Sequence, residues 1–260
     1  MTRKQAAVVF GLSAMGTAFP MLAAQGTRET GPKQSFETTS TERVNFQPGG
    51  TISLNSSYGY LTVEGWDEPE VEITVTKSTD RFHEPEQKEK AEKHFDEVRV
   101  VTERHSDKEL AISTALPRRN SLLTSVLPSG HIIVTTPVPP NHKRGVTVEY
   151  TVHVPRDSRV IVHQDNGYVW VSDVRGDIEV DSHTGDLIVM LPDPDAYWID
   201  ARTGMGSVSS DLMGRGHKRY LVGSHFVHAG QAPSRRIFLR MGRGSITIKN
   251  GPASGPFWKN

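Results

Sequence analysis

The sequence predicts an all-β fold, a β-solenoid-like stack of short strands with glycine turns. One phrase, a glycine followed by apolar residues two and four positions later, begins at Gly167, Gly176 and Gly185, nine residues apart. A period of two places both apolar residues of each copy on one face of a strand. Glycine suits a turn with positive φ or a close backbone approach. Because one short strand cannot bury its apolar face alone, this regular spacing indicates strands stacked on one another.

Six apolar side chains are expected to face the shared interior of this stack: Val169, Val171, Ile178, Val180, Leu187 and Val189. If two nine-residue units form one coil, Val169 lies beside Leu187 and Val171 beside Val189, at the strand spacing of about 4.8 Å. The alternative fold is an antiparallel β-meander or sandwich, because the short linker at residues 172–176 can also close a hairpin. The direction of the strands between residues 168 and 189 distinguishes the two.

The same phrase also begins at four other glycines, Gly50, Gly59, Gly130 and Gly244. The glycines expected to form structural turns are Gly50, Gly59, Gly167, Gly176, Gly185 and Gly244. An alternating apolar strand over residues 146–154 stops at Pro155. Further strands are expected over residues 71–76, 98–102, 110–113, 196–199, 207–212, 221–227, 237–241 and 245–248.

The 260 residues are expected to comprise an export signal, a leader, one domain and a tail. Basic residues precede apolar runs that are broken by Pro20, and small residues follow at 24–26, so residues 1–26 indicate a signal peptide rather than a transmembrane anchor. The polar residues 27–43 are expected to form a flexible leader. We expect residues 44–250 to form a single elongated β-repeat domain, with a charged, partly helical and loop-rich insertion at 79–145, and residues 251–260 to form a tail.

An export signal implies a location in the periplasm, on the cell surface or outside the cell, with no transmembrane segment in the mature chain. The chain has no cysteine, which excludes disulfides, thiolate metal sites and cysteine nucleophiles. The motifs of serine hydrolases, phosphate-binding loops and zinc peptidases are also absent from the sequence. We therefore expect a protein that is not an enzyme and that has no cofactor and no bound metal.

Two groups of residues have side chains that can bind metals, but neither has the arrangement of a metal site. His225 and His228 would point to opposite faces of a strand, which favours surface histidines over a pair of ligands. Four aspartates in the repeat could bind calcium, but the paired glycines of a calcium-binding repeat are missing. They are Asp173, Asp177, Asp181 and Asp186.

Aromatic residues alternate with the inward-facing residues of the repeat. If Val169 and Val171 face inward, Tyr168 and Trp170 face outward, and Tyr60 occupies the matching place in the earlier copy. Exposed aromatic rings on a ladder can stack on sugar rings, so these three residues are candidate binding residues. The alternative is that another segment of the chain covers them.

Positive charge is concentrated late in the sequence, although the net charge is zero. From Leu212 to the end there are nine Lys or Arg residues and no Asp or Glu. Arg235, Arg236 and Arg240 are therefore candidates for binding anionic envelope polymers, and removing their charge is expected to weaken retention on an anionic polysaccharide. The alternative is that these basic residues pair with the acidic N-terminal half of the chain within one fold.

Short motifs give the chain a resemblance to one family. They are Phe46, Pro48-Gly49-Gly50, Gly59-Tyr60-Leu61-Thr62-Val63, Gly65-Trp66-Asp67 and Glu70-Val71, then a strand ending at Pro155, Asn166-Gly167 and Thr184-Gly185. Over residues 43–78 and 146–250 the chain resembles the bacterial putative-adhesin domain family of unknown function. The resemblance implies an exported, all-β, solenoid-like domain, and it supplies no catalytic residues.

The function expected from these features is that of an exported, non-enzymatic envelope or surface protein, an adhesin or an interaction scaffold. Its expected partner is an envelope polysaccharide or another surface protein, and nucleic acid is not expected as a partner of an exported chain. The alternative is a carbohydrate-active enzyme on a β-helix scaffold, for which converging carboxylates in a pocket would be the sign.

Overall fold

The computed structural model describes residues 34–82, 95, 99–115, 125–126, 132–133, 146–219 and 222–251. The chain divides into two units, residues 1–31 and 32–260, and all of the described residues belong to the second. The predicted signal peptide, most of the predicted helical part of the insertion and the predicted tail beyond Gly251 lie outside the described residues.

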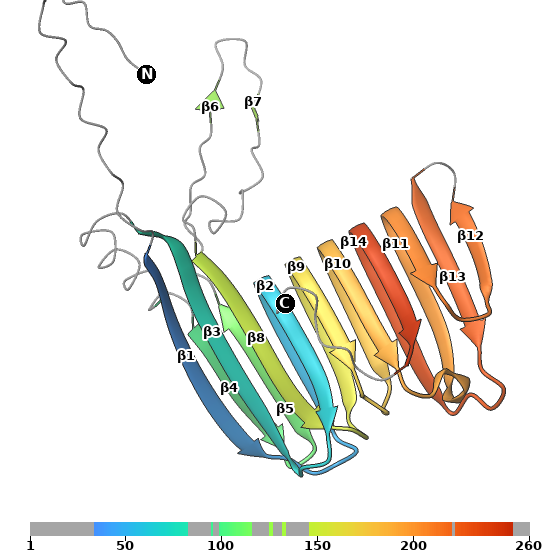
Figure 1. The fold of residues 1–260 in the computed structure, drawn as a ribbon, viewed down its shortest axis with the longest axis horizontal. Coiled ribbons are helices and arrows are strands. Elements are labelled where there is room, and N and C mark those ends of the chain that lie inside the picture. Colours follow the sequence, from blue (N-terminus) through green and yellow to red (C-terminus); the bar gives the residue numbers. More distant parts are fainter. Residues whose placement is uncertain are drawn as a thin grey trace, which may run out of the picture. The chain divides into compact units, whose positions relative to one another are not determined.

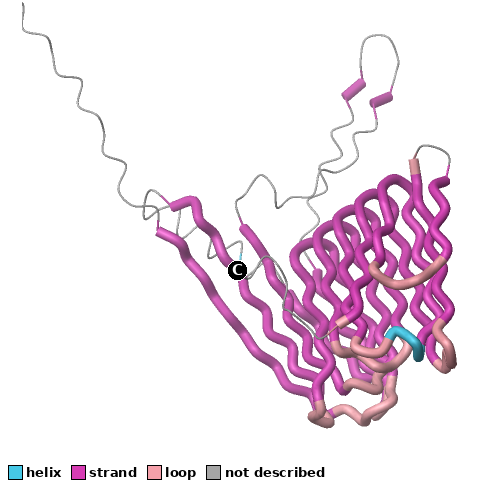
Figure 2. Tube along the Cα trace, turned by 45° about the vertical axis from the view of Figure 1, so that its right-hand side comes forward, coloured by secondary structure: helices cyan, strands magenta, loops and turns pink. Residues whose placement is uncertain are grey.

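Twelve strands form one mixed sheet, which confirms the all-β prediction (Figure 1). Six come from the earlier part of the chain: β1 (Gln34–Asn45), β2 (Thr51–Trp66), β3 (Glu70–Phe82), β4 (Arg99–Ser106), β5 (Glu109–Ala115) and β8 (Val146–Pro155). Six come later: β9 (Arg159–Ser172), β10 (Ile178–Leu191), β11 (Tyr197–Ser210), β12 (Arg215–Arg219), β13 (Gly223–Ala229) and β14 (Arg235–Asn250). Further elements are the 3-10 turn η1 (Pro194–Ala196), cyan in Figure 2, and the separately paired β6 (Ser125–Val126) and β7 (Ile132–Ile133).

The sheet is parallel in its centre, antiparallel towards its ends, and unclosed. Its order is β1-β3-β8-β2-β9-β10-β14-β11-β13-β12, with β5 also paired to β2 and β4 to β5. Strands β2, β9, β10, β14 and β11 run parallel to one another. The outer pairs β1–β3, β3–β8, β4–β5, β11–β13 and β12–β13 are antiparallel, and these fit the meander or sandwich alternative.

The predicted register between two copies of the repeat is confirmed. Val169 lies opposite Leu187 and Val171 opposite Val189, on the parallel strands β9 and β10. All six side chains predicted to face inward are 0–1% exposed. The order of the strands nevertheless differs from a simple succession of coils, because β14 lies between β10 and β11.

Each of the five central strands consists of two arms, which meet at a glycine. In β9, Val160 and Val162 are buried before Gly167, and Val169 and Val171 are buried after it. The residues that face the core are therefore even-numbered before the glycine and odd-numbered after it. The buried residues of both arms belong to one hydrophobic cluster. We call the segments before and after the glycine the first arm and the second arm.

The junction glycines form a column across the sheet, in the order Gly59, Gly167, Gly185, Gly244 and Gly206. All five have positive φ, between 123° and 136°, a region that side chains rarely allow. A Cβ on any of the last four would also lie within 2 Å of the carbonyl oxygen of the neighbouring glycine in the column. The column therefore requires glycine for both conformation and space, and Gly206 joins the set predicted from the sequence.

At the other two predicted turn glycines, Gly50 and Gly176, glycine is needed only because another group lies close to the backbone. A Cβ on Gly50 would lie 2.5 Å from the ring of Phe46, and one on Gly176 would lie 2.0 Å from the carbonyl oxygen of Ser158. Neither has a positive φ. The nine-residue spacing therefore alternates between a strand junction, as at Gly167 and Gly185, and a loop between strands, as at Gly176.

One stretch differs from the expected domain plan. Residues 34–43 of the predicted leader form most of β1, which pairs with β3. Because both faces of β1 are largely exposed, it lacks the apolar alternation that would have marked it as a strand. Within the predicted insertion, residues 99–115 form the β4–β5 hairpin, which confirms the strands expected over residues 98–102 and 110–113, and β5 pairs with the first arm of β2.

Candidate functional site

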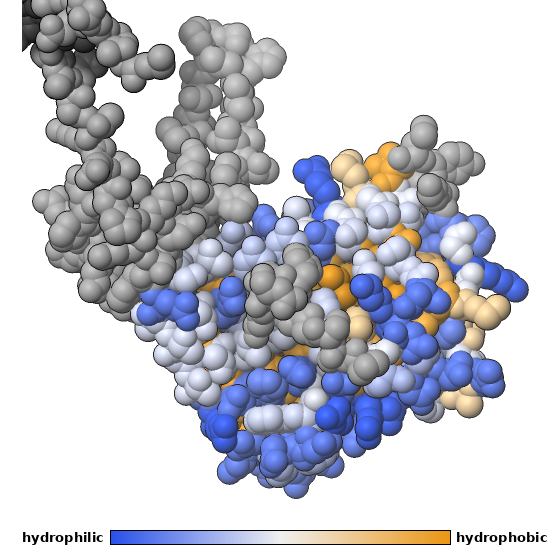
Figure 3. Space-filling model, in the orientation of Figure 1, coloured by the Kyte–Doolittle hydropathy of each residue, from blue (hydrophilic) through white to orange (hydrophobic). Residues whose placement is uncertain are grey.

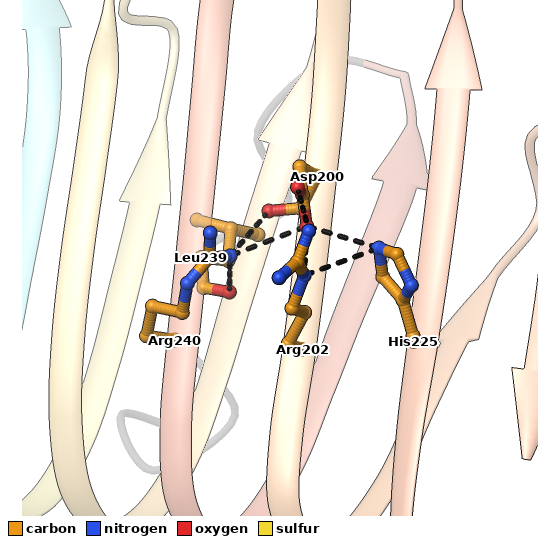
Figure 4. A network of polar contacts seen from close by, with 5 residues as sticks. All are labelled: Asp200, Arg202, His225, Leu239 and Arg240. Atoms are coloured by element: carbon orange, nitrogen blue, oxygen red, sulfur yellow. Dashed lines mark hydrogen bonds and ion pairs between the residues drawn. The ribbon is translucent and has the colours of Figure 1, made fainter. Parts of the chain in front are cut away.

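Four polar side chains converge on the outer face of the first arms, and we call them the Asp200 cluster: Asp200, Arg202, His225 and Arg240 (Figure 4). Alternation along the strands places them there. In β11, Ile199 and Ala201 are buried in the core, so Asp200 and Arg202 lie on the opposite face. In β14, Arg240 lies between the buried Leu239 and Met241.

The carboxylate of Asp200 is the centre of the cluster, and its side chain is only 5% exposed. Arg202 donates to both of its oxygens, from Nε to Oδ1 at 2.9 Å and from Nη2 to Oδ2 at 2.7 Å. Arg240 Nη1 donates to Oδ1 at 3.2 Å, and His225 Nε2 lies 3.1 Å from the same oxygen. Such two-pronged, charge-assisted contacts fix the orientation of a guanidinium group.

The charges around Asp200 lower the pKa of its carboxyl group below the ordinary 3.8. Burial alone would raise this pKa, since it disfavours the charged form. The hydrogen bond from Arg202 and the charges of Arg240, Arg202 and His225 together outweigh burial. Asp200 therefore stays ionised and holds two arginines on neighbouring strands.

An aromatic pair borders the cluster on the same face. Trp198 of β11 meets Phe238 of β14 edge to face, with ring centroids 5.5 Å apart. The guanidinium of Arg240 lies over the Phe238 ring, 6.0 Å from its centroid. The outer face of these two strands thus combines arginines with aromatic rings.

The structure brings two of the three predicted aromatic residues together and buries the third. Tyr60 and Tyr168 are in register on β2 and β9, with ring centroids 5.1 Å apart and planes 6° apart. Because each ring stacks on the other, one face of each ring is already used. Trp170 is only 4% exposed, so the prediction of an exposed ring does not hold for it, and coverage by other residues, the alternative, does.

Four of the tyrosines have pKa values above the ordinary 10: Tyr58, Tyr60, Tyr150 and Tyr197. Burial is the largest cause for each, and for Tyr150 it raises the pKa to about 12. We expect the ultraviolet titration of the native protein to lie at higher pH than that of the denatured chain. Since the folded state holds these protons more tightly, its stability is expected to fall as pH rises above about 10. Coincident titration curves for the two states would contradict this.

The three predicted basic residues lie on β14 but have different surroundings. Arg235 Nη2 is 3.8 Å from an oxygen of Asp157, and Arg240 belongs to the Asp200 cluster. Both arginines therefore pair with acidic residues, but these lie in the second half of the chain and not in the N-terminal half that the alternative predicted. Arg236 is exposed. Arg202 was missed because it precedes the basic block, although it follows Asp200 by two positions and so shares its face.

The two histidines considered as metal ligands do point to opposite faces of β13. His225 is in the Asp200 cluster, whereas His228 is 7% exposed and its Nδ1 lies 2.6 Å from the carbonyl oxygen of Met213. The prediction of a surface histidine is therefore wrong for His228, which is buried beside a backbone carbonyl. Among the described residues, no group of three or more His, Asp or Glu side chains is placed to hold a metal ion.

Aspartates of the repeat bind the backbone of β14. Asp177 accepts a hydrogen bond from the backbone N–H of Arg236 at 2.8 Å, and Asp186 accepts from the N–H of Ser245 at 3.1 Å and from its hydroxyl at 2.5 Å. These two aspartates therefore connect β14 to β10 and to the loop that precedes β10.

Hydrophilic residues also gather along the lower edge of Figure 3, where Figure 1 shows the loops that join the strands.

A shallow depression of about 520 Å³ lies on the outer face of β1, β3 and β8. Its lining is rich in hydroxyl groups and contains two carboxylates: Glu37, Thr74, Thr76, Ser78, Glu149, Thr151 and His153. His153 lies between two carboxylates, with Nδ1 3.3 Å from Glu72 and Nε2 3.6 Å from Glu64. In the described part of the chain, no helix has the length and apolar character needed to cross a membrane.

No family model matches the sequence, and no curated protein is similar to it in sequence. The solved structures similar to this chain include bacterial proteins named as adhesins, the family that the sequence resembles. A "putative cell adhesion protein" from Clostridium sporogenes has a TM-score of 0.44 and 15% identity, over 82% of this chain and 100% of that one. A "putative adhesin" from Parabacteroides distasonis has a TM-score of 0.24 and 9% identity, over 59% and 57% of the two chains, and one from Bacteroides fragilis 0.24 and 11%, over 82% and 97%. At TM-scores this low, the likenesses carry no argument about what the chain does.

Proposed function

We propose that this chain is an exported, non-enzymatic envelope or surface protein that acts as an adhesin or interaction scaffold. The observation that carries the proposal is the alignment of outward side chains in rows across parallel strands. One such row contains Glu149, Tyr60, Tyr168, Asp186 and Ser245, on five neighbouring strands. Neighbouring strands of a sheet display such side chains at a fixed interval of about 4.8 Å.

Rigidity makes these rows suitable for recognition. The inward residues of both arms are packed in one cluster, and the glycine column fixes the junction between them. A partner that binds such a surface does not have to order it first, which lowers the entropic cost of binding. The rows therefore suit an extended partner with repeated groups, such as an envelope polysaccharide or a strand of another surface protein.

A glycan array tests this function, with each positive glycan then incubated with the full chain and analysed for products. We expect binding to at least one glycan without turnover, and loss of that binding when the chain is unfolded by heat. Absence of binding to every glycan, and to purified envelope fractions, would contradict the role of an interaction scaffold.

A carbohydrate-active enzyme is the second candidate, favoured by Glu37 and Glu149 in the depression beside β1 and β8. Two carboxylates at one site can serve as acid and base in glycoside cleavage. If the array assay does find turnover, Glu149→Gln is expected to abolish it, whereas Glu64→Gln, on the neighbouring β2, is expected to leave it intact. Equal loss in both variants would remove the depression as the active site.

A further inference from the structure

We propose that the outer face around the Asp200 cluster binds an acidic polysaccharide through its carboxylate or sulfate groups. This inference rests on the proposed function and names the class of ligand. The face is formed by the first arms of β14 and β11 together with β13 and β12, which are consecutive in the sheet.

One row on this face carries nitrogen donors on four consecutive strands: Arg240, Arg202, His225 and His217. Three strand spacings make this row about 14 Å long. An extended polymer lying across the strands would meet a donor at each step. The row is bounded by Asp181 of β10, which is in register with Arg240 and would repel an anion.

The two arginines of the row are held in place yet remain accessible. Asp200 binds one edge of the Arg202 guanidinium and one nitrogen of Arg240, while these side chains are 47% and 38% exposed. Within the described part of the chain, Nη1 of Arg202 and Nη2 of Arg240 have no protein partner. A guanidinium group that is held at one edge can donate two hydrogen bonds from another edge to a carboxylate or sulfate. Because its side chain is already ordered, this binding loses little further side-chain entropy.

Charge on this face is strongly unbalanced. Among its described side chains, four arginines stand against the single carboxylate of Asp200: Arg202, Arg215, Arg236 and Arg240. Arg215 and Arg236 are exposed and lie outside the Asp200 cluster. By contrast, the same face of β10 carries Glu179 and Asp181. An anionic ligand is therefore attracted to β14, β11, β13 and β12 and is excluded from β10.

The aromatic pair favours a saccharide over other anions. Trp198 is half-buried and packs against Phe238 between the arginines of this face. A sugar ring presents apolar C–H groups that pack against an aromatic side chain, while its acidic substituent binds a guanidinium. A phosphatidylglycerol head group has no such ring and would use the charge alone.

The experiment compares two double variants of the full chain, each with two positive charges removed. Arg215→Gln/Arg236→Gln changes the proposed face without touching the Asp200 cluster. Arg175→Gln/Lys249→Gln is the matched control, because Arg175 lies in the loop before β10 and Lys249 on the second arm of β14, and both are exposed. Binding is measured to polygalacturonate, dextran sulfate, neutral dextran and phosphatidylglycerol vesicles, at about 0.05 M and about 0.5 M salt.

We expect the wild-type chain to bind polygalacturonate or dextran sulfate and not neutral dextran, and to bind more weakly at the higher salt concentration. The face variant is expected to bind about five- to tenfold more weakly than wild type, and the control variant within about twofold. Equal weakening in both variants, or binding to the vesicles alone, would overturn the proposal. If the array finds a neutral glycan whose binding the face variant retains, or if only envelope fractions are bound, this inference fails while the scaffold function stands; no binding to any glycan or to envelope fractions defeats both.

Discussion

Replacement of Gly185 by alanine is expected to cost about 3–5 kcal/mol of folding free energy, a large part of the roughly 5–15 kcal/mol typical of a domain. Gly185 has φ of 136°, which an alanine rarely adopts, and its new Cβ would lie 1.6 Å from the carbonyl oxygen of Gly167. Because that oxygen belongs to the backbone of the adjacent strand, the strands would have to separate. Urea denaturation followed by circular dichroism measures the loss.

Two other glycines provide a graded control. A Cβ on Gly204 would lie 2.8 Å from the carbonyl oxygen of Gly242, at an ordinary φ, and we expect an intermediate loss of about 1–2 kcal/mol. A Cβ on Gly216 of β12 would have no heavy atom within 4 Å, so Gly216→Ala is expected to change stability by less than about 1 kcal/mol. An unfolding midpoint for Gly185→Ala equal to that for Gly216→Ala would refute the role of the glycine column.

Replacement of Asp200 by asparagine is expected to cost about 2–4 kcal/mol near neutral pH. The carboxylate is buried and neutralises Arg202 and Arg240, which are in register on neighbouring strands and would otherwise repel each other. Because the pKa of Asp200 is lowered, its stabilisation is complete above the unfolded-state pKa of about 3.8 and is lost as pH falls through the lower folded-state pKa. The difference in stability between wild type and Asp200→Asn should therefore shrink at acid pH.

Asp181→Asn is the matched control for this change, since Asp181 is an exposed carboxylate on the same outer face, in register with Arg240. We expect it to change the free energy of unfolding by less than about 0.5 kcal/mol. If the two asparagine variants lost the same stability, or if the loss at Asp200 were independent of pH, the carboxylate would not be what holds the two arginines.

The spacing of glycines predicted much of the fold, because a junction that excludes side chains requires glycine and can therefore be recognised in the sequence. Gly167 and Gly185 indicated both the corners and the pairing of Val169 with Leu187. The position of β14 was not predictable in this way. Its junction at Gly244 has the same pattern as the others, so nothing local specifies that it lies between Gly185 and Gly206.

The candidate site was only partly predictable, for a related reason. The concentration of positive charge identified Arg240 as a candidate, but the burial of Asp200 depends on β13 and β14, which approach from elsewhere in the chain. For Trp170, alternation predicted the outward position but left exposure and coverage by another segment as open alternatives, and the ring is buried. Contacts with strands that are distant in sequence decide which outward residues become buried or paired. The periodicity of the sequence does not specify these contacts.

The position of β14 in the sheet also constrains when the chain can fold during its synthesis. Of the twelve strands in the sheet, the last one synthesised is the one that joins β10 to β11. While the nascent chain stops short of Arg235, both of these strands lack a neighbour on one side, and the junction glycines at 185 and 206 have no Gly244 between them. The central strands of the sheet can therefore complete their pairing only after β14 has been synthesised. Until then the polypeptide remains incompletely folded.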